Sequence, residues 1–360
     1  MKKSKILLSR IRSRHRIAEK KRNRFHSLKK LRNIARNGTP GSKVKQFVTG
    51  SYTRSVKNRL KHIKAPDNFS FIENTEEMVQ FISEIQKQFW KKRGVFIIMD
   101  QVLRIDHGAI VVLLSIMVKF KEGRIEFNGS FPQNNAAKKI VKASGFIESL
   151  YNKSKSGQFF VPGRNNRILT TGWTNVSSEL SLEIMKDITP KIFNEKRILK
   201  GLHKVLIELM QNSHNHANLN EMGTKEWWLS VNTENELAKF SYIDYGVGIF
   251  ESLKNKKEDH VFKKWYNKAA SVFKDNAKVL KRILDGEMHQ TSTNQYFRGK
   301  GLPAIMEVYQ RNYIKSLHII TNDVFVSVEN GIYKTMDIDF NGTFVYWEIN
   351  KESVTHPWTE

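Results

Sequence analysis

The chain has no cysteine and no long uninterrupted hydrophobic run. Without thiols it cannot form disulfides, thiolate zinc sites or a cysteine nucleophile, and this composition fits a reducing interior. The longest apolar stretch, residues 105–120, is broken by Asp106, His107 and Lys119, which leaves too few consecutive apolar residues to cross a bilayer. We therefore expect a cytoplasmic protein without membrane insertion.

Acidic residues are almost missing from residues 1–64, which hold 22 Lys and Arg and a single acid, Glu19. The rest of the chain holds 39 Lys and Arg against 34 acids, so most of the net charge of +26 lies in this segment. A basic run attracts phosphate backbones by releasing condensed counterions. We expect residues 1–65 to be a basic arm, disordered or helical on binding, that contacts nucleic acid or a ribonucleoprotein. The alternative is a solvated arm that only raises solubility.

Beyond the arm the composition is that of a folded protein, with 39% apolar residues, 22 Phe and 7 Trp available for cores. Residues 66–150 alternate between helix and strand patterns. We expect a helix from Asn74, followed by strands and helices at 95–100, 108–120, 124–128 and 135–144.

This β-α-β-α pattern, with an aspartate in the turn after the first of these strands, resembles the STAS domain of anti-sigma-factor antagonists. Those regulators carry a phosphorylatable serine after that aspartate, whereas this chain has Asp106-His107-Gly108-Ala109. We therefore expect a docking or structural role for this turn.

Residues 151–177 are rich in Gly, Asn and Ser and predict a connection to a second domain, residues 178–352. Ser178 can cap a helix that Pro190 interrupts, and a second helix is expected at 194–217. Further strands are expected at 226–231, 238–243, 316–322, 324–328, 332–336 and 343–349, with a helix at 301–309. The polar, Lys-rich residues 251–297 are expected to form a lid.

Three separated segments of this second domain carry the chemistry. Glu208, Asn212 and His216 are four residues apart and fall on one stripe of a helix. The turns Asp244-Tyr-Gly-Val-Gly248 and Arg298-Gly-Lys-Gly301 contain glycines that let backbone approach a ligand closely. Taken singly, such a polar stripe is most often a solvent-facing helix surface, and the first glycine turn is an ordinary one.

Together, in this order and spacing, the segments resemble the GHKL ATPase family, shared by gyrase B subunits, mismatch-repair ATPases, sensor histidine kinases and anti-sigma kinases. The resemblance implies an α+β fold. It predicts a C-terminal Bergerat-type α/β sandwich, with an antiparallel or mixed sheet and helices on one face, preceded by the smaller STAS-like α/β domain and the basic arm. It also implies that ATP and Mg²⁺ are bound.

Carried over residue by residue, the resemblance makes Asn212 the magnesium ligand and Glu208 the general base that activates water. His216 is expected to pack or orient its neighbours. Asp244 would accept a hydrogen bond from the adenine amino group, with Gly246 and Gly248 bending the chain against the base. The remaining positions expected to contact nucleotide are Arg298, Gly299, Lys300, Gly301, Leu302 and Thr343.

We therefore expect a Mg²⁺-dependent ATP-binding protein, a slow ATPase whose lid closure switches its interaction with a protein or nucleic-acid partner. Nucleotide-dependent homodimerisation is a family expectation. Two alternatives stay open: a serine protein kinase of the anti-sigma type, and a nucleic-acid-bound scaffold that uses ATP structurally.

Overall fold

The computed structural model describes six stretches of the chain, residues 59–151, 166–171, 176–216, 227–254, 261–287 and 301–358. Residues 60–360 form one compact unit and residues 1–59 belong to another. The expected basic arm therefore lies almost wholly outside the described residues, as does most of the expected connection, and the division at residues 151–177 stays a prediction. Over the stretches that the structure describes, no helix is both long and apolar enough to span a membrane.

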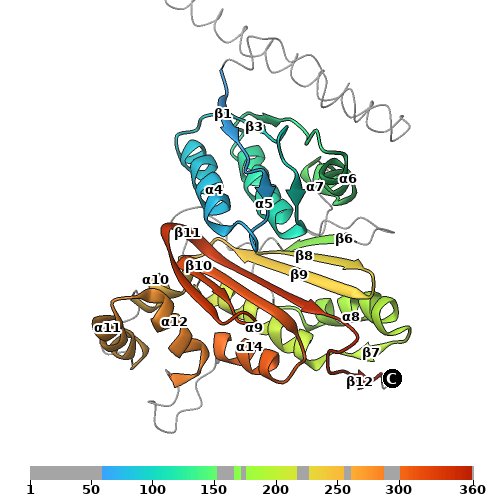
Figure 1. Cartoon of the computed structure of the whole chain (residues 1–360), viewed down its shortest axis with the longest axis vertical. Coiled ribbons are helices and arrows are strands. Elements are labelled where there is room, and N and C mark those ends of the chain that lie inside the picture. Colours follow the sequence, from blue (N-terminus) through green and yellow to red (C-terminus); the bar gives the residue numbers. More distant parts are fainter. Residues whose placement is uncertain are drawn as a thin grey trace, which may run out of the picture. The chain divides into compact units, whose positions relative to one another are not determined.

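The first part of the compact unit contains a small parallel sheet and four helices (Figure 1). The strands, in the spatial order β1-β3-β5, are β1 (Lys61–Lys64), β3 (Val95–Ile98) and β5 (Phe127–Gly129). Two short strands of the same part of the chain, β2 (Asn68–Phe69) and β4 (Arg104–Ile105), form a separate parallel pair. The helices are α4 (Thr75–Trp90), α5 (His107–Glu122), α6 (Asn135–Ala143) and α7 (Phe146–Tyr151). The predicted alternation of helix and strand is confirmed here, although the STAS arrangement itself remains a resemblance.

The second part is built on a five-stranded antiparallel sheet with the order β10-β11-β9-β8-β6. Its strands are β6 (Asn166–Thr171), β8 (Trp227–Glu234), β9 (Leu237–Asp244), β10 (Lys315–Ser327) and β11 (Ile332–Ile349). Four predicted strands merge into two: residues 316–322 and 324–328 form β10, and 332–336 and 343–349 form β11. Bulges around Asn322 bend β10 without ending it, so the polar residues there mark an irregular register and not a loop.

Among its described residues, the second part has six helices: α8 (Ser178–Phe193), α9 (Lys200–His216), α10 (Gly248–Lys254), α11 (Val261–Phe273), α12 (Asn276–Leu284) and α14 (Gly301–Gln310). A short antiparallel pair, β7 (Arg197–Ile198) and β12 (His356–Pro357), completes it. The expected break at Pro190 is wrong, because α8 continues through it to Phe193 and ends at Asn194 in the left-handed conformation. The predicted lid contains α11 and α12, and α12 packs on β10 and β11 through buried residues such as Leu280.

Both faces of the five-stranded sheet are covered, and neighbouring residues alternate between them (Figure 1). Trp227 packs with α8, α9 and the other helices of the second part, whereas Trp228 packs with the core around α4 and α5. The helices of residues 178–352 thus share one core, and the other face is covered by the preceding part of the chain.

Helix α5 is buried on every side from Gly108 to Phe120. It packs on β8 and β9 and also on β5 and α4. A helix placed between two sheets has no solvent face, which explains why its sequence is apolar all round.

Candidate functional site

Most of the predicted site residues are described, and they come from five elements. Glu208 and Asn212 lie on α9, and Asp244 ends β9. Gly246 lies in the turn that follows, and Gly248 begins α10. Gly301 and Leu302 begin α14, and Thr343 lies in β11. Arg298, Gly299 and Lys300 lie outside the described residues, and so does the side chain of His216.

The carboxylate of Asp244 is held against α9 by a serine. Ser213 Oγ donates to Asp244 Oδ2 over 3.1 Å, and the Tyr242 hydroxyl lies 2.7 Å from the same Oγ. The other carboxylate oxygen, Oδ1, accepts the Gly246 N–H over 2.9 Å. Each oxygen therefore has one protein donor and keeps a lone pair for a ligand N–H group.

Burial raises the pKa of Asp244 to about 6, against the lowering effect of its two donors, the Gly246 N–H and the Ser213 hydroxyl. The side chain is nevertheless only partly buried from solvent. Asp244 is thus largely ionised at neutral pH, and a ligand that donates a hydrogen bond to it would stabilise the charged form.

The other end of the polar stripe on α9 meets the start of α14. The Gly301 N–H donates to the Glu208 carboxylate. A β-carbon at Gly301, where φ is +32°, would lie only 3.3 Å from the amide of Asn212. A second contact between the helices is the ion pair of Lys204 Nζ with Glu307 Oε2 at 2.7 Å. Burial raises the pKa of Glu208, while the Gly301 N–H and the charge of Lys204 act in the opposite direction.

These contacts place the predicted residues in two groups that meet on α9. Glu208, Asn212 and Gly301 form one group, and Asp244 with its turn forms the other. Asn212 and Ser213 are adjacent in the chain and connect them. Gly301, at the start of α14, and the aspartate turn after β9 are therefore brought to the same helix. Leu302 is different, since its side chain is buried in the core and only its backbone belongs to the first turn of α14.

Strand β11 supplies the opposite side of the Asp244 turn. Thr343 is paired with Asp244 in the register of the antiparallel ladder. The residue before it, Gly342, has φ of +133°, and a β-carbon there would lie 2.1 Å from the Asp244 carbonyl oxygen. Only glycine permits this close approach of the two strands.

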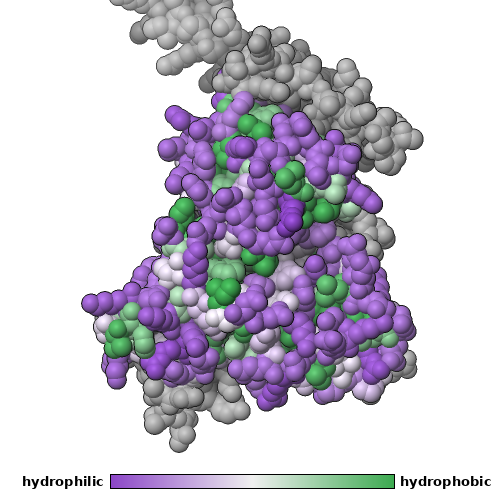
Figure 2. Space-filling model, in the orientation of Figure 1, coloured by the Kyte–Doolittle hydropathy of each residue, from purple (hydrophilic) through white to green (hydrophobic). Residues whose placement is uncertain are grey.

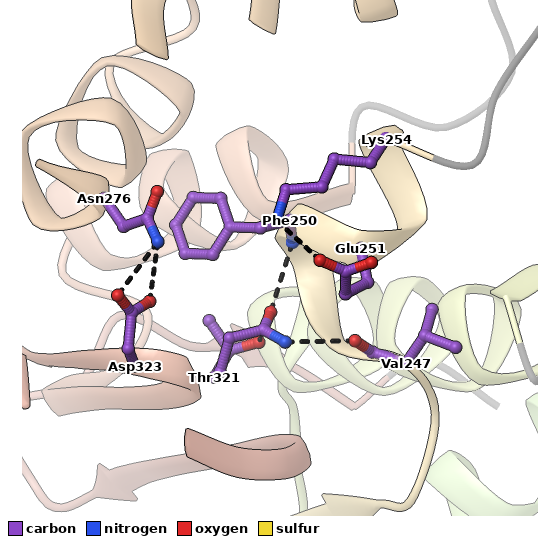
Figure 3. Close-up of polar contacts among 8 residues, drawn as sticks. Val247, Phe250, Glu251, Lys254, Asn276, Thr321 and Asp323 are labelled. Atoms are coloured by element: carbon purple, nitrogen blue, oxygen red, sulfur yellow. Dashed lines mark hydrogen bonds and ion pairs between the residues drawn. The ribbon is translucent and has the colours of Figure 1, made fainter. Parts of the chain in front are cut away.

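The turn itself is fixed by an asparagine that the sequence did not single out, Asn322, and Figure 3 labels two of the residues that it contacts, Val247 and Phe250. The Asn322 side chain accepts the Phe250 N–H over 3.2 Å and donates to the Val247 carbonyl over 3.1 Å. A β-carbon on Gly248, where φ is +75°, would lie 2.3 Å from Asn322 Oδ1. Thr321 accepts the Ile249 N–H over 3.1 Å. The sequence hints at this clamp only through two consecutive polar residues, Thr321 and Asn322. In the structure they lie at a bulge of β10.

Tyr245, between Asp244 and Gly246, points to the opposite face of the sheet. Its hydroxyl lies 2.7 Å from Ser115 Oγ on α5 and donates to the Val112 carbonyl over 3.2 Å. Burial raises the pKa of Tyr245 well above its usual value, so the phenol stays protonated. The turn is therefore held by α9 on one face and α5 on the other.

The start of α5 has the structural role expected for it. Asp106 is the N-cap, and its Oδ1 accepts the Ala109 N–H over 2.6 Å. A β-carbon on Gly108 would lie 2.9 Å from Ser241 Oγ and 3.0 Å from the Phe344 ring, so this turn is pressed against the five-stranded sheet.

The donor set is compatible with a nucleotide and magnesium. Within the described part of the chain, no group of three or more His, Asp or Glu side chains is placed to hold a metal ion. Magnesium prefers oxygen ligands and retains water, so Asn212 together with phosphate oxygens and waters would satisfy it. The unshared lone pairs of Asp244 and the backbone N–H at the start of α14 suit an adenine amino group and a phosphate respectively.

Comparison with known proteins adds no relative to this picture: no protein-family model matches the chain, and no curated protein sequence matches it significantly.

Proposed function

We propose that residues 178–352 bind Mg²⁺-ATP and hydrolyse it slowly, and that nucleotide occupancy switches the interaction of the chain with a protein or nucleic-acid partner. One observation carries the proposal most directly. A single helix, α9, contacts both an aspartate that ends a strand, through Ser213, and the backbone N–H of a glycine that begins another helix, through Glu208. Base recognition and phosphate binding require these two kinds of group at opposite ends of one ligand.

In this proposal Asp244 selects the base. Its ionised carboxylate accepts a hydrogen bond from the adenine amino group, which guanine does not offer at that position. Gly246 and Gly248 carry no side chains that would keep the base away from the turn. The Ser213 hydroxyl and the Gly246 N–H fix the orientation of the carboxylate before any ligand arrives, which lowers the entropic cost of binding.

In this proposal Glu208 acts in the hydrolytic step, and the burial that raises the pKa of its carboxyl makes it a stronger base. Without ligand its carboxylate accepts the Gly301 N–H. A bound phosphate would take this donor, and Glu208 would then be free to accept a proton from water as the water oxygen bonds to the γ-phosphorus. The bond from that phosphorus to the bridging oxygen breaks, and ADP leaves. Magnesium, held by Asn212, would neutralise charge on the phosphates.

The proposal is tested with the full chain by measuring ATP binding and phosphate release for Glu208→Gln and Asp244→Asn. Glu208→Gln should bind ATP while phosphate release falls by about 100-fold or more, since a general base contributes that much. Asp244→Asn should weaken ATP binding by about 10- to 100-fold and reduce discrimination against GTP, because a hydrogen bond to a charged group is lost. Glu183→Gln, on the exposed side of α8, is the matched control.

Undiminished hydrolysis in Asp244→Asn would contradict the assignment. The kinase alternative is resolved in the same experiment by following radiolabelled γ-phosphate, which would appear on a serine of a protein and not as free phosphate. The serine-free turn at Asp106–Ala109 offers no acceptor within this chain at the position that STAS regulators use.

A further inference from the structure

The amino ends of the three parallel strands meet at one edge of the small sheet. Three segments lie side by side there: the start of β1, the turn between α4 and β3, and the turn between α5 and β5. The Lys61 N–H donates to the Gly94 carbonyl over 2.9 Å, which joins the start of β1 to the turn between α4 and β3. The Val95 N–H donates to the Glu126 carbonyl over 3.1 Å, which joins that turn to the one between α5 and β5. This edge is also where the chain enters the compact unit, at Leu60.

The side chains at this edge are basic with one aromatic among them. We call the following exposed residues the amino-end patch: Trp90, Lys91, Lys92, Arg93 and Arg124. Hydrophilic residues dominate the visible surface over α4, while some hydrophobic residues are visible near the start of β1 (Figure 2).

None of the four cations of the patch makes an ion pair with any residue that the structure describes. Two acids, Glu122 and Glu126, lie beside Arg124 in the chain. Glu122 is paired with Lys119, its Oε2 lying 3.7 Å from Lys119 Nζ. The patch therefore carries a net positive charge, and its cations are available to a ligand.

Trp90 is half exposed, with 50% of its surface open to solvent. Its ring meets Phe89 edge to face, with centroids 5.4 Å apart, and Phe89 in turn contacts Phe120 in the core at 5.4 Å. The indole is thus supported from the protein side and presents apolar surface beside Lys91 and Lys92. Cations at the end of a helix also complement its dipole, but that effect does not account for an exposed indole among them.

An exposed aromatic ring that packs on the core on one side, with unpaired cations on the same edge, is an arrangement that can bind single-stranded nucleic acid. The ring stacks on a base, whatever its identity, and the cations contact the phosphates on either side.

We propose that the amino-end patch is a binding site for single-stranded nucleic acid, in which Trp90 stacks on a base and its neighbouring cations contact phosphates. The site does not depend on ATP binding. It adds a folded, aromatic contact to the contribution of the basic arm.

Two cations of the patch can be removed without harming the fold. Lys92 and Arg124 follow the ends of α4 and α5 with φ of +50° and +56°, a conformation in which glycine is the residue of lowest energy. Lys92→Gly and Arg124→Gly should therefore leave thermal stability unchanged or raise it. Lys274 follows the end of α11 with φ of +51°, so Lys274→Gly removes one charge from the same backbone conformation elsewhere and serves as the matched control.

The experiment measures binding of the full chain to fluorescein-labelled oligothymidylate and oligouridylate by anisotropy over a range of salt concentrations. Each lost phosphate contact should reduce the slope of log affinity against log salt by about 0.7, hence about 1.4 for the Lys92→Gly/Arg124→Gly double variant. Lys274→Gly should retain the wild-type slope.

The stacking contact is tested with a pair of substitutions. Trp90→Ala should weaken binding by about tenfold or more with an unchanged salt slope, and Trp90→Phe should restore most of the affinity, because only a π face is needed. The proposal is overturned if all patch variants bind like wild type, if Lys274→Gly has the same effect as Lys92→Gly, or if the patch variants lose binding to vesicles of anionic lipid while oligonucleotide binding is unchanged.

Discussion

Asp244 and Tyr245 are neighbours in the chain, yet their side chains leave the five-stranded sheet on opposite faces and meet different surroundings. Asp244 faces α9, where its donors are a hydroxyl and a backbone N–H and its carboxylate stays partly exposed. Tyr245 faces α5, where its hydroxyl is satisfied by Ser115 and Val112 inside a dry core. Each face thus fixes the same turn by different means.

Under the proposed function, the difference separates contacts that stabilise the fold from groups that a nucleotide would use. On the α5 face the hydroxyls of Tyr245 and Ser115 and the Val112 carbonyl satisfy one another. On the α9 face the Asp244 carboxylate keeps lone pairs that a ligand could use. Substitutions on the two faces should therefore have separable effects.

The largest expected effect is the loss of packing on the α5 face. Phe344 is fully buried and stacks on Phe71 with ring centroids 5.1 Å apart. Phe344→Ala should lower the free energy of unfolding by about 3–5 kcal/mol, measured by urea denaturation, because it leaves a cavity. ATP affinity of the folded fraction should hardly change. Ile332→Ala, at an exposed position of the same strand, should stay within about 0.5 kcal/mol of wild type.

A second substitution tests the close approach of β11 to the Asp244 turn. Gly342→Ala should destabilise the fold by about 2–4 kcal/mol and weaken ATP binding, since the added carbon meets a backbone oxygen and the backbone conformation becomes strained. Gly331→Ala is the control, because Gly331 also has a positive φ but no atom within 4 Å of the added carbon. Equal losses in both variants would show that the strand contact is unimportant.

The polar link to α5 is expected to contribute less. Tyr245→Phe and Ser115→Ala should each cost about 1 kcal/mol of unfolding free energy. The double variant should cost less than the sum, because both remove one shared hydrogen bond. Strict additivity in this double-mutant cycle would mean that the two hydroxyls act independently. If this hydrogen bond also positions the Asp244 turn, Tyr245→Phe will weaken ATP binding a few-fold.

The smallest effect concerns pH. Because the pKa of Asp244 is raised to about 6, its ionised form in the folded state is unfavourable relative to the unfolded chain. The contribution of Asp244 to the free energy of unfolding therefore increases as pH falls from about 6 towards about 4. Near pH 4 the carboxyl of the unfolded chain also takes up a proton. Adenine recognition uses the ionised form, so ATP affinity should fall about twofold by pH 6 relative to neutral pH. In Asp244→Asn, calorimetric titrations with ATP should show no such fall in affinity between neutral pH and pH 6.

Several features of the candidate site follow from local sequence. The four-residue spacing places Glu208 and Asn212 on one side of α9, while Leu202, Leu206 and Leu209 are buried on the other. Glycines at 248 and 342 occupy backbone conformations that other residues would find strained. Local pattern succeeds here because helix periodicity and the need for glycine are properties of a few consecutive residues.

Other features had no local signal. Ser213 and Asn322 hold the Asp244 turn, but a serine on a helix and an asparagine in a strand each have many ordinary roles. The continuation of α8 through Pro190, and the union of four predicted strands into two, were decided by packing that overrides local preference.

The sequence by itself determined the order and type of most elements and the residues that could serve a nucleotide, because these depend on periodicity, glycine and charge within short windows. The tertiary structure alone decided that α5 covers the second face of the sheet and that Tyr245 is anchored to it. That outcome rests on contacts between residues more than a hundred positions apart, such as Ser115 and Tyr245, whose pairing depends on how two sheets pack around one helix.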